Sequence, residues 1–162
     1  MILLDNLDLY EYSDKTFKNH INYCSSHPTF LKGSIKENLL LSEKDFSKIE
    51  KMCQKVGVLD QIKDLPGGFG CPISDIKSSG TLFLIGLVRA ALSDCKILMI
   101  YEIPSDTPAA FRNKIKKLIT ENNLNKTIIL FTHASTYDDI AELTYEVKAG
   151  RVKAIKAQKK NK

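Results

Sequence analysis

The segment Ile97-Leu98-Met99-Ile100-Tyr101-Glu102-Ile103-Pro104 joins an apolar run to a carboxylate and a proline. Such a run, with a lysine before it, is typical of a central parallel strand that is buried on both faces. In open α/β sheets, the chemistry gathers at the carboxyl ends of the strands. The segment therefore predicts an α/β domain and makes Glu102 the first candidate site residue.

A second segment of the same kind, Thr127-Ile128-Ile129-Leu130-Phe131, is followed by Thr132 and His133. Parallel strands of one sheet end at the same edge, so a carboxylate and an imidazole are expected side by side there. His133 is the second candidate site residue.

Length and composition indicate one globular domain. The chain has 162 residues, of which 43% are hydrophobic and 27% are charged, so a disordered body is excluded. The four cysteines form no Cys-x-x-Cys pair, which favours buried thiols in a reduced, cytoplasmic interior. The longest apolar run, 82–88, is too short to span a bilayer, and no signal segment is expected.

Other function classes find no support in the sequence. The three histidines lie in unrelated segments and no Gly-x-Ser-x-Gly occurs, which argues against a metal site or a serine nucleophile. The net charge of +5 owes much to lysines after residue 152. No aromatic residues separate these lysines, so residues 153–162 are interpreted as a solvated, flexible basic tail rather than a nucleic-acid arm.

Local patterns predict the remaining elements. Residues 2–9 read as a strand, a turn and a return, and residues 21–25 as a strand. Ser34 and Glu37 form a capping box for the next helix, and Ser42 is expected to introduce a helix over 45–56. Two further helices are expected, a short one over 59–62 and a longer one over 109–122 with Pro108 in its first turn. A hairpin is expected over 145–152.

Taken in order, the segments from Ile21 to Val152 resemble the C-terminal two-thirds of the ATP-binding domain of an ABC exporter. Residues 33–39, Gly-Ser-Ile-Lys-Glu-Asn-Leu, match the exporter pattern most closely. Residues 97–102 match the Walker B strand, and 127–133 match the strand that ends in the switch histidine. The resemblance implies a P-loop-NTPase-like three-layer domain over 1–152, with a mostly parallel sheet and a helical subdomain over about 34–92.

The same resemblance implies a dismantled nucleotide site. The sequence contains no Gly-x-x-x-x-Gly-Lys-Ser/Thr, so the Walker A strand and loop are absent. Tyr101 stands where the family has its magnesium-supporting aspartate. The resemblance assigns vestigial catalytic roles to Glu102 and His133. It assigns vestigial nucleotide contacts to Ser78 and Gly80 of the signature motif and to Ser26 at the glutamine position, with no metal ligand.

Two structural expectations follow. In the family topology the missing strand lies between the histidine strand and the C-terminal strand, so its loss leaves two unpaired edges or makes the sheet close up. The helix after Ser78 is apolar on all sides and must be buried on all sides. Its face at Leu82–Leu87 favours association with another chain.

The sequence thus favours a degenerate ABC ATP-binding domain that acts as a structural or interaction module and needs no cofactor. Its expected partners are the membrane domain of an exporter, docking around Phe30–Lys36, or a second ATP-binding domain in a homo- or heterodimer. Through such a partner it would lie at the inner face of the membrane. One alternative is a split ATPase, which binds ATP and magnesium when another chain supplies Walker A; another is a decayed remnant. The capped helix at 34–39 also fits a purely structural role.

Overall fold

The computed structural model describes residues 2–104, 107–121, 124–133 and 137–157. It divides into two compact units, Met1–Thr132 and His133–Lys162. The boundary between the units falls inside the domain predicted for residues 1–152.

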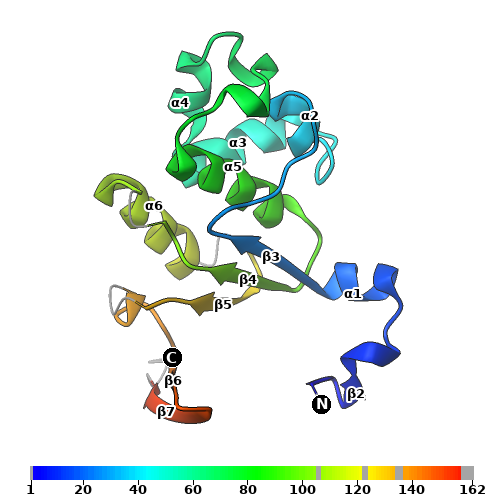
Figure 1. Ribbon diagram of the computed structural model, residues 1–162, viewed down its shortest axis with the longest axis vertical. Helices are drawn as coiled ribbons and strands as arrows, with labels where there is room; N and C mark the ends of the chain where they lie inside the picture. Colours follow the sequence, from blue (N-terminus) through cyan, green and yellow to red (C-terminus); the bar gives the residue numbers. More distant parts are fainter. Residues whose placement is uncertain (1, 105–106, 122–123, 134–136, 158–162) are drawn as a thin grey trace. The chain divides into compact units, whose positions relative to one another are not determined.

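The first unit is built on a parallel three-stranded sheet (Figure 1). Its strands are β3 (Ile21–Ser25), β4 (Ile97–Tyr101) and β5 (Thr127–Phe131), in the order β3-β4-β5. The strands are in register along their whole length, so Tyr101 lies opposite Phe131. The predicted α/β class and the central position of residues 97–101 are confirmed.

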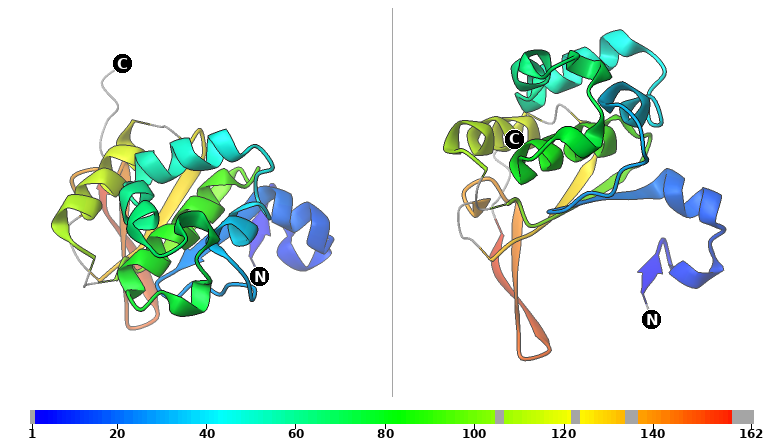
Figure 2. Two further views of the ribbon diagram at one scale, coloured as in Figure 1. Left: turned by 90° about the horizontal axis from the view of Figure 1, so that it is seen from above. Right: turned by 45° about the horizontal axis from the view of Figure 1, so that its top comes forward.

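Helices cover one face of this sheet (Figures 1 and 2). α5 (Ser79–Leu92) and α6 (Ala109–Thr120) lie nearest the strands. A further layer packs on α5 and corresponds to the predicted helical subdomain. It consists of α2 (Ile35–Leu39), α3 (Phe46–Val56) and α4 (Leu59–Asp64).

The opposite face of the sheet is open, and the prediction that β4 is buried on both faces is wrong. Side chains alternate along a strand, so Leu98 and Ile100 face the helices and are buried. No described helix of the first unit packs on the other side. The side chains there are apolar and exposed: Tyr23 66%, Tyr101 50%, Ile129 41% and Phe131 41%.

α5 is buried within the chain itself. It contacts β3, α2 and α3, and every side chain from Phe83 to Val88 is buried. The predicted all-round burial is confirmed. The association inferred from Leu82–Leu87 is not supported, because the chain's own helices and sheet cover this face. None of the helices in the described ranges combines the length and the apolarity needed to cross a bilayer.

Side-chain caps fix the ends of the subdomain helices. The Ser34 hydroxyl accepts from the Glu37 amide at 3.2 Å, and the Glu37 carboxylate accepts from the Ser34 amide at 2.7 Å, which confirms the capping box. This donation to the carboxylate lowers the pKa of Glu37.

The cap of α3 differs from the prediction. Asp45, directly before the first helical residue, accepts from the Ser47 amide at 2.9 Å. Ser42 lies too far upstream to do so, and its amide instead bonds Leu39 at the end of α2. Gly57 ends α3 in the left-handed conformation, at a φ of 95°.

The N-terminal segment contains one element that the sequence analysis missed. The predicted strand, turn and return are β1 (Leu3–Leu4) and β2 (Leu7–Asp8). After a short 3₁₀ turn, α1 (Asp14–His20) begins with Ser13 as its N-cap and leads into β3. The sequence signal for this helix is Ser13, a capping residue that precedes a short polar run.

The second unit contains an antiparallel hairpin of β6 (Leu143–Lys148) and β7 (Arg151–Ala157). Ala149 and Gly150 both have positive φ, 49° and 72°, as a two-residue hairpin turn requires. β7 continues to Ala157, so paired strand extends into the range predicted as a tail from residue 153. Residues 158–162 lie outside the described residues. The hairpin and the parallel sheet remain separate sheets.

Candidate functional site

Glu102 lies at the carboxyl edge of the sheet, as predicted. Its amide donates to the carbonyl of Phe131 at 2.9 Å, which extends the pairing of β4 with β5 by one residue. Its φ of 47° places it in the left-handed region. Such a conformation is costly for a residue with a side chain and is enriched at functional sites. The chain turns away from the sheet at this residue.

His133 follows β5 and is exposed. It is the first residue of the second unit, so its predicted contact with Glu102 stays a prediction. The register of β4 and β5 supports the first step of that prediction, because both strands end at the same level of the sheet.

Ser78 and Ser26 lie near the beginning of α5. Ser78 is the N-cap, and its hydroxyl accepts from the Thr81 amide at 3.1 Å. The Ser26 hydroxyl lies 3.1 Å from Nδ1 of His27. Ser26 and Ser79 line one small cavity of about 80 Å³. The structure therefore brings the loop after β3 to the first turn of α5.

Gly80 of α5 lies against Thr107. A Cβ at Gly80 would lie 3.8 Å from both Cα and Oγ1 of Thr107. Thr107 is 1% exposed, and its hydroxyl finds no hydrogen-bond partner in the described part of the chain. No sequence pattern marks Thr107 as a site residue. Ser26, Ser78 and Gly80 thus gather at one end of α5, and Thr107 lies at the same place.

Replacing Thr107 by valine is expected to stabilise the protein. A buried hydroxyl without a partner costs about 1–3 kcal/mol, and valine has nearly the same shape without that group. We expect the melting temperature to rise by about 2–4 °C per kcal/mol recovered, measured by circular dichroism. Thr107→Ser, which keeps the hydroxyl and removes the methyl group, should lower it. A decrease for both variants would show that the hydroxyl is satisfied.

Tyr101 occupies the position of the family's aspartate. Its ring lies 6.1 Å from that of Phe131, between ring centroids, on the open face of the sheet. A neutral phenol is a poor substitute for a carboxylate as a magnesium ligand. Within the described ranges, no cluster of three or more histidine, cysteine, aspartate or glutamate side chains is arranged to hold a metal ion.

The glycine-rich segment after α4 forms a turn. Gly68–Gly70 is a short 3₁₀ helix, and Gly67 before it has a φ of 81°. Its amides bond the chain's own carbonyls: Gly68 to Leu65 at 2.8 Å, Gly70 to Gly67 at 2.8 Å and Cys71 to Gly68 at 3.0 Å. A phosphate cradle needs such amides to point at the ligand.

Hydrogen bonds from Asn38 and Arg89 fix the backbone around the predicted docking face, Phe30–Lys36. Asn38, which is 1% exposed, bonds both the amide and the carbonyl of Leu31, at 2.9 and 3.1 Å. Arg89 of α5 donates to the Thr29 carbonyl at 2.7 Å and lies over the Phe30 ring. Sequence reasoning missed Asn38 because an asparagine inside a helix gives no signal of its long-range partners.

A parallel sheet with helices, whose central strand ends at an acidic residue, defines a P-loop-NTPase-like α/β chain. Comparison with known proteins narrows this class. The chain is 26% identical to the ABC multidrug transporter atrD of Emericella nidulans over 158 residues. It is 29% identical to the lactococcin transport/processing ATP-binding protein LcnC-like of Lactococcus lactis over 157 residues.

Both alignments cover 93% of this chain, but only 12% and 22% of the two relatives. No family model matches the chain. The chain is therefore related, over nearly its whole length, to ATP-binding transport proteins of the ABC exporter type, and it corresponds to a small part of each relative.

Proposed function

We propose that this chain is a degenerate ABC ATP-binding domain that serves as an interaction module of a transporter-like assembly, without hydrolysing ATP. The observation that carries the proposal is the contrast between the retained parts of the scaffold and an altered site. The capping box, the buried α5 and the strand end at Glu102 are all present. Tyr101 stands at the aspartate position, and the glycine-rich amides are bonded within their own turn.

The rate loss expected from each missing catalytic group supports a loss of ATP hydrolysis. Removal of one preorganised charge-stabilising group can lower a rate by about a hundred- to a thousandfold. On the alignment that the resemblance implies, Tyr101 stands at the magnesium-supporting aspartate and Ser26 stands at the glutamine. We infer that these two losses together make this chain alone an ineffective catalyst.

The partners that we propose are the membrane domain of an exporter or a second ATP-binding domain. The rigid segment Phe30–Lys36 supports a docking role, because Leu31 within it is 62% exposed although Asn38 fixes its backbone. A surface that is ordered before binding loses less entropy on association. A membrane-domain partner would hold the chain at the inner face of the membrane.

The proposal is tested by equilibrium binding of a fluorescent ATP analogue, with and without magnesium. We expect absent or millimolar binding that magnesium does not change. Micromolar binding that depends on magnesium would overturn the proposal, because another loop would then have to hold the phosphates. The 29% identical lactococcal relative is the positive control.

A second candidate function, half of a split ATPase, is favoured by the open face of the sheet. Parallel sheets are almost always covered on both faces, and among the described strands β5 pairs with β4 alone. A strand from another chain could pair with the free edge of β5, and a helix from that chain could cover Tyr23, Tyr101 and Ile129 on the open face. The same titration, repeated with a polypeptide that carries a strand, a Gly-x-x-x-x-Gly-Lys-Ser loop and a helix, tests it. Magnesium-dependent ATP binding that needs both chains would favour this second function.

A further inference from the structure

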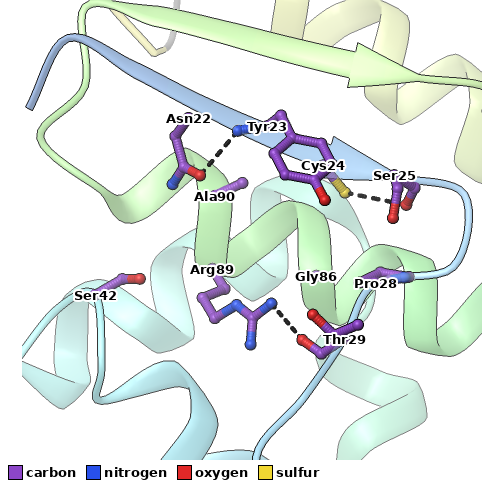
Figure 3. Close-up of a pocket in the computed structure, with 10 residues that line it drawn as sticks. All are labelled: Asn22, Tyr23, Cys24, Ser25, Pro28, Thr29, Ser42, Gly86, Arg89 and Ala90. Carbon is purple, nitrogen blue, oxygen red and sulfur yellow. Dashed lines mark hydrogen bonds between the residues drawn. The ribbon is translucent and has the colours of Figure 1, made fainter. Parts of the chain in front are cut away.

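A second, polar cavity lies beside β3 and α5 (Figure 3). Its volume is about 160 Å³. The polar side chains that line it are Asn22, Ser25, Thr29, Ser42 and Arg89. Arg89 projects from α5 toward the Thr29 segment, and Ser42, from the turn after α2, lies on its other side (Figure 3).

Arg89 is the only cationic side chain that lines this cavity, and it has no anionic partner among the described residues. One Nη2–H bonds the Thr29 carbonyl at 2.7 Å, and the guanidinium lies 4.8 Å from the centre of the Phe30 ring. Half-burial without a carboxylate lowers the pKa of Arg89 through desolvation. A guanidinium has five N–H donors in a plane, so most of them remain for a ligand.

Two hydroxyl groups accompany the guanidinium. The side chains of Thr29 and Ser42 make no hydrogen bond to another residue in the described ranges, so their hydroxyls are open to a ligand. Asn22 is already engaged, because its amide donates to the Ser93 hydroxyl at 2.9 Å and its carbonyl accepts from the Tyr23 amide. The cavity therefore offers one unpaired cation and several hydrogen-bond donors.

We propose that this cavity is a binding site for a carboxylate group. The planar fork of an arginine matches the two oxygens of a carboxylate, and the hydroxyls can donate to the same oxygens. The volume accommodates a carboxylate and the few carbons that carry it, but not a nucleotide. Such a site is independent of ATP binding, and it adjoins the proposed docking face because Arg89 also lies over the Phe30 ring.

The carboxylate has two sources: a free small molecule or an acidic side chain of a partner protein. A half-exposed ion pair gains little in water, so a free anion would bind weakly. A side chain delivered by a bound partner benefits from a high effective concentration. The chemistry at Arg89 is the same in both cases, and the experiment separates them.

The first arm of the test is an NMR titration of the full chain with sodium acetate, at constant ionic strength, observing the backbone amide resonances of the lining residues Ser25, Thr29 and Ala90, which both the parent chain and the variant contain. We expect a saturable shift, weakened about tenfold or more in Arg89→Lys, which keeps the charge but loses the fork. Sodium phosphate at the same ionic strength is the comparison anion, because the arginine fork also matches phosphate oxygens. Tighter phosphate binding, or equal acetate binding by Arg89→Lys, would overturn the assignment.

The second arm supplies the carboxylate from the chain itself. Ser42→Asp should raise the melting temperature by about 2–4 °C relative to Ser42→Asn, which has the same shape without the charge. It should also abolish the acetate shift. This readout leaves Arg89 intact, so it stands even if Arg89→Lys fails to fold.

The two arms together identify the source. Saturation by millimolar acetate would support a free small carboxylate, whereas stabilisation by Ser42→Asp without acetate binding would support an acidic side chain of a partner. Absence of both effects would refute the site.

Discussion

Replacing Phe83 by alanine is expected to lower the free energy of unfolding by about 3–5 kcal/mol. Phe83 is 0% exposed and lies in α5, the helix that contacts the sheet on one side and α2 and α3 on the other. The loss combines the transfer free energy of the ring with the cavity left behind. Because domains of this kind are stable by only about 5–15 kcal/mol, such a loss would remove much of the stability.

Urea unfolding followed by circular dichroism measures this effect. Tyr10→Ala is the matched control, because this ring is 98% exposed and its removal should change the stability by no more than about 0.5 kcal/mol. A loss below 1 kcal/mol for Phe83→Ala would contradict the position of α5 at the centre of the core. A similar loss for both variants would point to a general effect of removing aromatic rings.

Local sequence signals predicted the elements well because each of them rests on neighbouring residues. The capping box of Ser34 and Glu37 and the apolar run at 97–101 both need only short-range patterns. The cap of α3 shows the limit of this approach. Ser42 and Asp45 both have the chemistry of a cap, and only the backbone path decides that Asp45 starts the helix.

The open face of the sheet could not be read from the sequence. Residues 97–100 are apolar without interruption, as in a strand that is buried on both sides. Whether helices cover the second face of the sheet depends on other segments of the protein. The residues of the strand itself do not indicate it. Tyr23 and Tyr101 belong to apolar strands, yet both are exposed on this face.

The candidate site was predicted in part. Ser78 and Gly80 were assigned through the resemblance to the family's signature motif, and Glu102 through its place after a strand. Thr107, Asn38 and Arg89 were not, because the Thr107 hydroxyl has no partner among the described residues, while Asn38 and Arg89 bond backbone groups outside their own helices. Only a three-dimensional arrangement reveals a donor without an acceptor.

Replacing Gly86 by alanine is expected to destabilise the protein although alanine favours helices. A Cβ at this position would lie 2.6 Å from Cβ of Pro28 and closer still to Cγ, and Cys24 lies just beyond, at 3.7 Å from Sγ. The proline ring is stiff and cannot rotate away. Alanine gains about 1 kcal/mol of helix propensity, whereas forced overpacking costs about 1–3 kcal/mol or more. The steric term should prevail, with a net loss measured by urea unfolding.

The cause of this loss can be separated from any general effect of alanine. Gly70→Ala, where a Cβ would meet nothing within 4 Å, should be nearly neutral. In a Pro28→Gly background both Cβ and Cγ of residue 28 are absent, so adding Gly86→Ala should become neutral or stabilising. An equal loss in both backgrounds would mean that Gly86 is not held against the loop after β3. If the coupling is found, the close contact of α5 with this loop fixes Ser26 beside the first turn of the helix, and this contact preserves the arrangement of the site even where its chemistry has changed.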